Sequence, residues 1–374
     1  MVDALMVSSS FLPGRGGIES FLAELCAELS PRLAVLAPAR RDGRPIPASL
    51  PYETTGYPGA MLLPTRPIAR AIEREAHRHQ TDRILFGTPW PLALVGPRLR
   101  RRGLRYAVVV HAAEVLVPSA VPGIASLLAR ALAGADVLLP VSQFTASRVE
   151  RLLERHKRPV PPTRVLRARV DVDRFHPGID TSAARARLGL ADESPVVLCL
   201  GRLVKRKGVD RLIDALDALN ERVPGVVLVV AGTGPEERKL RARASNKNAR
   251  VVFAGRVPDE DAPATYALAD VFALPVVDRY RGLEVEGLGV VLLEASACGV
   301  PCVTGRSGGT PEAVVDGVTG FVVDASDRDR LADRIAWLLE HPDEATVMGA
   351  AGRAHVAEEF TGPPVALTTW LDGR

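Results

Sequence analysis

Residues 284–304 read Glu-Val-Glu-Gly-Leu-Gly-Val-Val-Leu-Leu-Glu-Ala-Ser-Ala-Cys-Gly-Val-Pro-Cys-Val-Thr. This stretch carries two carboxylates, Glu286 and Glu294, which stand eight positions apart with a Gly-Leu-Gly turn between them. The run 290–298 has the pattern of a helix, and the glycine and proline that follow end it. We therefore expect Glu286 in the loop before a helix N-terminus, beside free backbone N–H groups, and Glu294 about one turn inside the helix.

The residues of this turn suit a ligand that is rich in oxygen. Gly287 and Gly289 let the backbone approach a bound molecule closely, and the helix N-terminus beside them offers N–H groups to its oxygen atoms. The two carboxylates offer acceptors to hydroxyl groups. The combination indicates a sugar attached to a diphosphate, and a solvated helix with two surface glutamates is the alternative.

The stretch resembles the signature of the retaining glycosyltransferases of family four, whose Glu-x7-Glu motif lies between donor sugar and donor ribose. Within that family it is most similar to the actinobacterial phosphatidylinositol monomannoside mannosyltransferases, which use GDP-mannose. The resemblance covers about residues 5–360 and is stronger in the second half of the chain. It implies the α/β fold named GT-B, in which two Rossmann-like, doubly wound domains face a central cleft, and transfer with retention of the anomeric configuration.

A second loop, Gly201-Arg-Leu-Val-Lys-Arg-Lys-Gly, lies between a strand-like run at 196–200 and a helix that begins near Val209. Arginine offers a diphosphate a planar fork and lysine a point charge, although a charged loop is also an ordinary soluble surface. Gly-Arg-Leu followed by Lys-Gly matches the family at this spacing. The resemblance implies that Arg202 and Lys207 hold the donor phosphates and stabilise charge on the leaving diphosphate.

The resemblance also assigns the rest of the donor site. Glu294 is expected to accept hydrogen bonds from the ribose, and Glu286 is expected to hold the sugar ring. The backbone at Val257 is expected to meet the base. The amides that assist Glu286 belong to four consecutive residues, namely Gly287, Leu288, Gly289 and Val290.

Strand-like and helical runs alternate along the chain, which is typical of parallel, doubly wound sheets. In the first half the strand-like runs are 4–10, 34–37, 83–86, 106–110 and 137–141. In the second half they are 196–200, 226–232, 251–255 and 271–275. The sequence therefore predicts two α/β domains of similar construction.

Two places in the first half indicate a ligand site. Gly14, Gly16 and Gly17 follow the first strand, and strand, glycine loop and helix is the layout of a phosphate-binding turn. The resemblance implies that Gly16 and Gly17 close over the donor phosphate and sugar. His111 follows the run 106–110, at the strand edge where open α/β sheets bind ligands, and it matches the family's active-site histidine, which is expected to contact the sugar at its reacting side. Here His-Ala-Ala-Glu replaces the family's usual His-Gly-x-Glu.

The composition is that of a soluble globular protein, with 47% hydrophobic and 25% charged residues in a chain of 374. No apolar run approaches the roughly 18 residues that span a bilayer, and the N-terminus lacks the basic and apolar segments of a signal peptide. We therefore expect a cytoplasmic location. The cysteines are interpreted as buried free thiols, and neither a metal site nor a cofactor is expected; these residues are Cys26, Cys199, Cys298 and Cys302.

Charge is distributed unevenly along the chain. Residues 1–180 carry 25 Lys and Arg against 16 Asp and Glu, whereas residues 181–374 carry 23 against 28. A basic half suggests an anionic partner, and its arginines gather at 98–105 and 148–169. Contact with anionic lipid on the inner face of the plasma membrane, at about 1 kcal/mol per basic residue, is one interpretation, and a solvated face is the other.

The Pro-rich segment 156–182 is the predicted linker between domains. We expect an acceptor-binding domain over residues 1–175 and a nucleotide-sugar-binding domain over residues 176–355. The segment 356–374 is expected to return toward the first domain.

The predicted function is transfer of a hexose, namely mannose from GDP-mannose, to a lipid-linked acceptor such as a phosphatidylinositol mannoside. A family-four enzyme that uses a UDP-sugar on a soluble or polysaccharide acceptor is the first alternative. A sugar-nucleotide epimerase of the same architecture, a dinucleotide-dependent oxidoreductase and a catalytically silent carbohydrate-binding relative are the others. The absence of Gly-x-Gly-x-x-Gly after the first strand counts against the oxidoreductase, and no nucleic-acid partner is expected.

Overall fold

The computed structural model describes residues 2–14, 16–41 and 43–373, and the chain divides into two compact units. The first unit contains Met1–Ala168 together with Pro363–Arg374, and the second contains Arg169–Gly362. The first break lies inside the segment 156–182. The boundaries expected from the sequence lie after residues 175 and 355, whereas the two breaks lie after residues 168 and 362.

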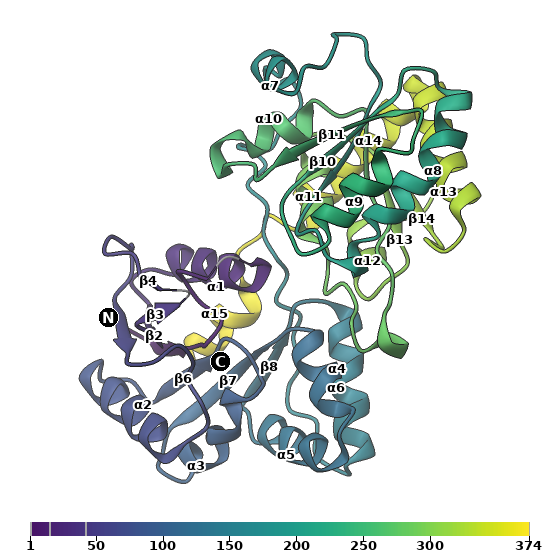
Figure 1. The fold of residues 1–374 in the computed structure, drawn as a ribbon. Coiled ribbons are helices and arrows are strands. Elements are labelled where there is room, and N and C mark those ends of the chain that lie inside the picture. Colours follow the sequence, from purple (N-terminus) through teal and green to yellow (C-terminus); the bar gives the residue numbers. More distant parts are fainter. Residues whose placement is uncertain (1, 15, 42, 374) are drawn as a thin grey trace. The chain divides into compact units, whose positions relative to one another are not determined.

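The first unit is built on a six-stranded sheet with the order β5-β2-β1-β6-β7-β8, and every neighbouring pair is parallel (Figure 1). Its strands are β1 (Ala4–Val7), β2 (Leu33–Pro38), β5 (Thr54–Tyr57), β6 (Arg83–Phe86), β7 (Arg105–Val110) and β8 (Val137–Pro140). A short antiparallel hairpin of β3 (Arg40–Arg41) and β4 (Arg44–Pro45) follows β2.

Helices cover both faces of this sheet. Successive side chains of a strand point to opposite faces, so Leu5 and Val7 belong to one buried cluster while Ala4 and Met6 belong to another. The first cluster includes residues of α2 (Arg66–Arg78), α3 (Gly96–Arg100), α5 (Pro122–Ala133) and α6 (Gln143–Arg155). The second includes residues of α1 (Gly17–Glu28) and α15 (Val365–Leu371). Helix α4 (Ala113–Ser119) follows β7 and contributes Val115 to the first cluster.

Helix α15 belongs to the first unit although it lies at the end of the chain (Figure 1). Leu367, Trp370 and Leu371 are buried in the same cluster as α1, and burial of such a side chain contributes about 1.5–3 kcal/mol. Arg32 Nη2 also lies 2.7 Å from Asp372 Oδ1. These contacts attach the end of the chain to the first sheet.

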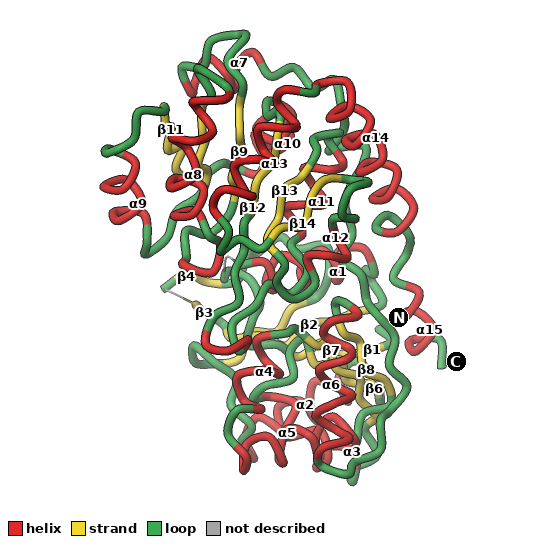
Figure 2. Tube along the Cα trace, turned by 90° about the vertical axis from the view of Figure 1, so that its right-hand side faces the viewer, coloured by secondary structure: helices red, strands yellow, loops and turns green. Residues whose placement is uncertain are grey.

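The second unit has a parallel sheet of six strands with the order β11-β10-β9-β12-β13-β14. The strands are β9 (Val196–Leu200), β10 (Val227–Ala231), β11 (Arg250–Gly255), β12 (Val271–Leu274), β13 (Cys302–Gly305) and β14 (Gly320–Val323). The helices are α7 (Ser182–Leu188), α8 (Val209–Arg222), α9 (Glu237–Ala244), α10 (Ala262–Ala267), α11 (Val290–Ala297), α12 (Thr310–Ala313), α13 (Arg328–Glu340) and α14 (Pro342–Glu359). Helix α8 packs against α13, and α11 packs against α14. In Figure 2 the strands of each sheet, in yellow, lie between helices, in red.

Each predicted strand is confirmed within a few residues. Strands β9 and β10 have the sequences Val-Val-Leu-Cys-Leu and Val-Leu-Val-Val-Ala and are almost wholly buried. Strands that are buried on both faces are read from such continuous apolar runs rather than from alternation. The four cysteines are buried free thiols, as predicted.

Both sheets share one topological rule. In each unit the first strand lies in the middle, and the chain builds first one side of the sheet and then the other. The reversal brings together the loops after β1 and β6 in the first unit, and the loops after β9 and β12 in the second. Open α/β sheets bind ligands outside the carboxyl ends of strands at this switch point. None of the helices in the described ranges combines the length and apolar character that crossing a bilayer requires.

Candidate active site

The loops after β9 and β12 meet at the switch point of the second sheet. Lys207 ends the short helical turn Lys205–Lys207 after β9, and Glu286 lies between β12 and α11. Lys207 Nζ lies 2.8 Å from Glu286 Oε2, and Arg206 Nη1 lies 2.5 Å from the same oxygen. Two cations of one loop therefore hold the carboxylate of the other.

Close backbone packing fixes the turn that carries Lys207. Gly208, which begins α8, has a φ of +70°, and a Cβ atom at this position would lie 1.9 Å from the carbonyl oxygen of Pro275. Only glycine tolerates both the left-handed conformation and this approach. Since Pro275 directly follows β12, the turn is pressed against the neighbouring loop.

The backbone of Glu286 is held from the other side by the segment after β13. Its N–H donates to Ser307 Oγ over 3.1 Å, and its carbonyl accepts from the Gly309 N–H over 3.1 Å. A Cβ atom on Gly308 would lie 1.8 Å from the Glu286 carbonyl oxygen, and Gly308 has a φ of +56°. The position of Glu286 is thus set by three loops at the same sheet edge.

The charge of Glu286 depends on its cationic neighbours. Burial by itself would raise the pKa of this carboxyl, but the charges and hydrogen bonds of Lys207 and Arg206 outweigh burial and lower the pKa below its ordinary value. Lys207 is only 8% exposed, so the pair is shielded from solvent. Glu286 is therefore an ionised acceptor at neutral pH.

Four consecutive backbone amides follow Glu286, at Gly287, Leu288, Gly289 and Val290. Gly289, with a φ of +89°, precedes the first residue of α11. Within the described ranges, none of these four N–H groups donates a hydrogen bond to a protein acceptor. Free amides at a helix N-terminus bind anionic or oxygen-rich groups, as the sequence predicts for this turn.

Glu294 lies four residues inside α11 and has a partner that the sequence did not reveal. Tyr266 of α10 donates its hydroxyl to Glu294 Oε2 over 2.5 Å. Burial raises the pKa of the Glu294 carboxyl above its ordinary value, although the hydrogen bond from Tyr266 acts in the opposite direction. Tyr266 itself is buried between Phe175 and Phe272, which fixes the direction of the hydroxyl.

The other donor-site candidates lie on loops at the same edge of the second sheet. Arg202 directly follows Gly201 after β9 and is exposed, and its side chain makes no hydrogen bond or ion pair with any described residue. Val257 lies two residues after β11 and is half-buried. The structure therefore brings Lys207 and Glu286 into contact and leaves Arg202 free for a ligand.

In the first unit, His111 follows β7 and is only 8% exposed. Its ring packs edge-on against Phe21, with the ring centroids 5.8 Å apart. Burial lowers the pKa of His111 to about 4, and a hydrogen bond with the backbone of Gly87 opposes that shift. Nε2 has no hydrogen-bond partner in the part of the chain that the structure describes. A neutral imidazole with an unpaired nitrogen can donate to or accept from a ligand hydroxyl.

Two carboxylates accompany His111 in the first unit. Glu114 lies three residues further on, in α4, and its Oε2 is buried without a partner among the described residues. Burial, assisted by the charge of Glu19, raises the pKa of Glu114 to about 8. Glu19 lies in the first turn of α1, and a Cβ atom on Gly16 would be 2.5 Å from its Oε2. Gly16 thus leaves room for the Glu19 carboxylate, while a Cβ atom on Gly17 would meet nothing within 4 Å.

The raised pKa of Glu114 predicts a pH-dependent stability. The folded state keeps the Glu114 proton up to about pH 8, whereas the unfolded chain loses it near 4.5. The part of the folding stability that depends on protonated Glu114 is fully present below pH 4.5 and is lost as the pH rises to 8. We therefore expect Glu114→Gln to raise the thermal midpoint more at pH 8 than at pH 5. Glu150→Gln, at an exposed site in the same unit, is the control, and an equal change at both pH values for Glu114→Gln would contradict the assignment.

Two Rossmann-like sheets in one chain, the second with cations and a carboxylate at its switch point, define the GT-B class of glycosyltransferase folds. The profile of the family Glycosyl transferases group 1 matches residues 180–355, and that of Glycosyltransferase Family 4 matches residues 15–182. The GDP-mannose-dependent alpha-(1-6)-phosphatidylinositol monomannoside mannosyltransferase of Mycolicibacterium smegmatis is 42% identical over 93% of this chain and 92% of its own length. The chain belongs to glycosyltransferase family 4.

Two further comparisons show how far the similarity to known proteins extends in sequence and in structure. A D-inositol 3-phosphate glycosyltransferase of Mycobacterium avium is 39% identical over only 50% of this chain and 43% of its own length. The structure of sucrose-phosphate synthase from Thermosynechococcus elongatus superposes with a TM-score of 0.82 at 22% identity, covering 99% of this chain and 98% of that one. The structural likeness supports the GT-B fold, and family membership excludes the epimerase and the oxidoreductase.

Proposed function

We propose that the chain transfers mannose from GDP-mannose to a phosphatidylinositol monomannoside, with retention of the anomeric configuration. The observation that carries this proposal is the 42% identity to an enzyme of that name over more than nine tenths of both chains. A relative with another name matches only half of the chain. Similarity through both units therefore favours the same acceptor class as well as the same donor.

The donor is proposed to bind at the switch point of the second sheet. Arg202 and Lys207 would contact the diphosphate, where fixed positive charge stabilises the leaving group. The amides of 287–290 would meet the oxygens of the phosphate and sugar, and Glu286 would accept hydrogen bonds from the sugar hydroxyls. Glu294, held by Tyr266, would accept from the ribose. The backbone at Val257 would contact the base.

The first unit is proposed to supply the acceptor site and further donor contacts. His111 has an unpaired ring nitrogen and is assigned to the sugar. Gly16 and Gly17 begin α1 with little side-chain bulk, and they are assigned to the donor phosphate. Contact of this unit with an anionic membrane belongs to the same proposal, because a phosphatidylinositol-based acceptor is anionic and embedded in a bilayer. Such a contact places the enzyme at the inner face of the plasma membrane.

The test is transfer of label from GDP-mannose to phosphatidylinositol monomannoside in vesicles, with UDP-glucose and UDP-N-acetylglucosamine as competing donors. We expect a dimannosylated lipid from GDP-mannose and no product from the UDP-sugars. Thermal stabilisation by the nucleotides gives an independent measure, since a ligand at 100 times its Kd adds about 2.7 kcal/mol. Transfer from a UDP-sugar alone would replace the donor assignment, and transfer only to a soluble acceptor would replace the lipid assignment.

A further inference from the structure

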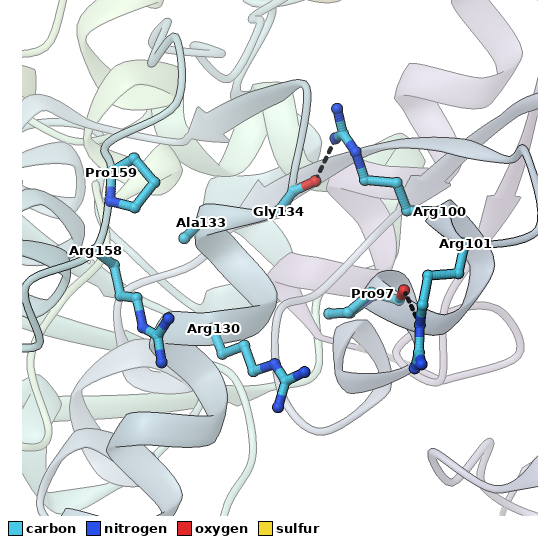
Figure 3. Close-up of a pocket in the computed structure, with 8 residues that line it drawn as sticks. All are labelled: Pro97, Arg100, Arg101, Arg130, Ala133, Gly134, Arg158 and Pro159. Atoms are coloured by element: carbon cyan, nitrogen blue, oxygen red, sulfur yellow. Dashed lines mark hydrogen bonds between the residues drawn. The ribbon is translucent and has the colours of Figure 1, made fainter.

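A cavity of about 340 Å³ opens on the surface of the first unit, and none of the candidate active-site residues lines it (Figure 3). It is lined by Pro97, Arg100, Arg101, Arg130, Ala133, Gly134, Arg158 and Pro159. We call it the arginine pocket, because four of these residues are arginines and, among the described residues, no acidic side chain lines it.

Three separate segments supply the arginines. Arg100 and Arg101 lie at the end of α3, Arg130 lies near the end of α5, and Arg158 lies three residues after α6. The ends of α3 and α5 precede β7 and β8, so the pocket lies at the amino ends of these strands. His111 and the loops of the switch point lie at the carboxyl ends. The arginine pocket is therefore distinct from the candidate active site.

The four side chains differ in what holds them. Arg100 Nη1 donates to the Gly134 carbonyl over 2.6 Å and to Asp136 Oδ1 over 3.1 Å, and Arg101 Nε donates to the Pro97 carbonyl over 3.3 Å. Asp136 is also paired with Arg105, whose Nε lies 3.0 Å from Oδ2. The only carboxylate paired with a pocket arginine is thus shared between two cations within the described ranges.

The other two arginines, Arg130 and Arg158, have exposed side chains without a hydrogen bond or ion pair to any residue of the described ranges. In Figure 3 both guanidinium groups lie below Ala133 in the view. By contrast, Arg222 of the second unit is an exposed arginine that pairs with Asp333 and Glu340. An uncompensated group of cations around one hollow is electrostatically unfavourable until an anion binds.

The arginine side chains of the pocket favour phosphate as the anion. A guanidinium presents a rigid planar fork that matches phosphate oxygens, and arginines are preferred over lysines for this contact. Apolar side chains lie close by in the sequence: Leu127 is one helical turn before Arg130 and 54% exposed, and Val160 is two residues after Arg158 and 42% exposed. Exposed apolar residues beside a basic cluster are typical of proteins that lie on a membrane surface.

We propose that the arginine pocket binds a phosphate group, carried by a phospholipid head group or by a soluble phosphate ester, at a site separate from the donor site. The exposed Leu127 and Val160 favour the lipid as its source. The inference rests on the charge and geometry of the first unit alone. It does not depend on which sugar is transferred or on which acceptor receives it.

The experiment compares the full chain with Arg130→Ala/Arg158→Ala and with a control, Arg44→Ala/Arg164→Ala. The control removes the same charge from exposed positions of the first unit outside the pocket. One arm measures co-sedimentation with vesicles of phosphatidylcholine alone or with added phosphatidylinositol. The other measures the thermal midpoint with rising inorganic phosphate or glycerol 3-phosphate, without nucleotide. Because both pocket residues are exposed and unpaired, the variant is expected to keep the wild-type midpoint when no phosphate is present.

We expect the pocket variant to lose roughly tenfold or more of the affinity for phosphatidylinositol vesicles, since two charge-assisted contacts are removed. The control should lose clearly less, because its two arginines do not line the pocket and act only through a general attraction that salt screens. Vesicle binding alone identifies a lipid as the source, and stabilisation by phosphate alone, lost in the pocket variant, identifies a soluble ester. Equal behaviour of wild type and pocket variant in both arms, or equal losses in pocket variant and control, would overturn the site.

Discussion

Replacement of Glu286 by alanine is expected to remove mannosyl transfer while GDP still binds. GDP contains no hexose, and in the proposed complex the partner of Glu286 is the sugar, so the nucleotide loses no contact. The loss of turnover should reach at least 100-fold, or about 2.7 kcal/mol, as for other preorganised groups that act on the reacting part of a substrate. Calorimetry with GDP and a labelled-mannose transfer assay measure the two properties separately.

The contacts of Glu286 also predict a cost in stability. Lys207 Nζ lies 2.8 Å from the carboxylate, and breaking a buried ion pair by removing one partner costs about 3–5 kcal/mol. Glu286→Gln keeps the volume and a hydrogen-bond acceptor, so it should be the more stable variant and equally inactive. Activity in the glutamine variant would mean that shape and hydrogen bonding suffice and that the negative charge is dispensable.

A matched control lies two residues earlier. Glu284 belongs to the same loop and pairs with Arg279 over 3.0 Å and with Arg206 over 3.8 Å. Glu284→Ala removes the same charge and disturbs the same arginine, yet we expect it to keep most of the turnover. Similar losses in the two alanine variants would assign the effect to the loop as a whole rather than to Glu286.

The second carboxylate should behave in the opposite way. Glu294→Ala is expected to weaken binding of GDP itself, because the ribose is present in GDP. Tyr266→Phe removes the hydrogen bond that orients Glu294 and should give a smaller loss in the same direction. If Glu286→Ala reduced GDP affinity and Glu294→Ala did not, the two roles would have to be exchanged.

The sequence predicted the frame of the fold because its strands are apolar runs buried on both faces. Among the strands of the two large sheets, β5, β13 and β14 were not predicted. Strand β5, Thr54–Tyr57, lies at the edge of its sheet, and Thr-Thr-Gly-Tyr carries no apolar run. The helix 290–298 was readable from its pattern and its glycine stop, and α11 confirms it. Such patterns lie within one strand or helix, so they can be recognised without knowledge of tertiary contacts.

The partners of the site residues were not readable in the same way. Arg206 stands next to Lys207 in a run of three cations, and only the folded structure shows that Arg206 also reaches Glu286. Tyr266 and Glu294 are 28 positions apart on different helices. Such pairs depend on how two loops or helices pack, and no spacing rule within one element reveals them.

The basic segment of the first unit shows the same limit. In the sequence the arginines at 98–105 form one basic group. In the structure, Arg100 and Arg105 are paired with Asp136, and Arg102 lies 3.5 Å from Glu73. The free cations at this surface come partly from elsewhere in the chain. Arg130 and Arg158 join Arg101 only because α3, α5 and the end of α6 come together.

Loss of either proposed diphosphate contact, in Arg202→Ala or Lys207→Ala, is expected to weaken GDP binding by about 1.5–3 kcal/mol, roughly 10- to 150-fold. Arg202 gives the cleaner measurement, because its side chain is exposed and makes no contact with the described residues that folding could lose. Lys207→Ala also removes one cation from Glu286, but Arg206 remains within 2.5 Å of that carboxylate and keeps it paired.

Lys205→Ala serves as the control for both variants, since Lys205 is an exposed cation of the same turn and has no proposed contact with the donor. If Arg202 and Lys207 contact the diphosphate directly, Lys205→Ala should keep full GDP affinity, and the other two variants should bind GDP more weakly. A general attraction of the loop for anions predicts equal, salt-dependent losses in all three, because exposed charges are screened alike. Wild-type affinity by calorimetry in both Arg202→Ala and Lys207→Ala would show that the diphosphate is held elsewhere, by the free amides of 287–290 or by residues of the first unit.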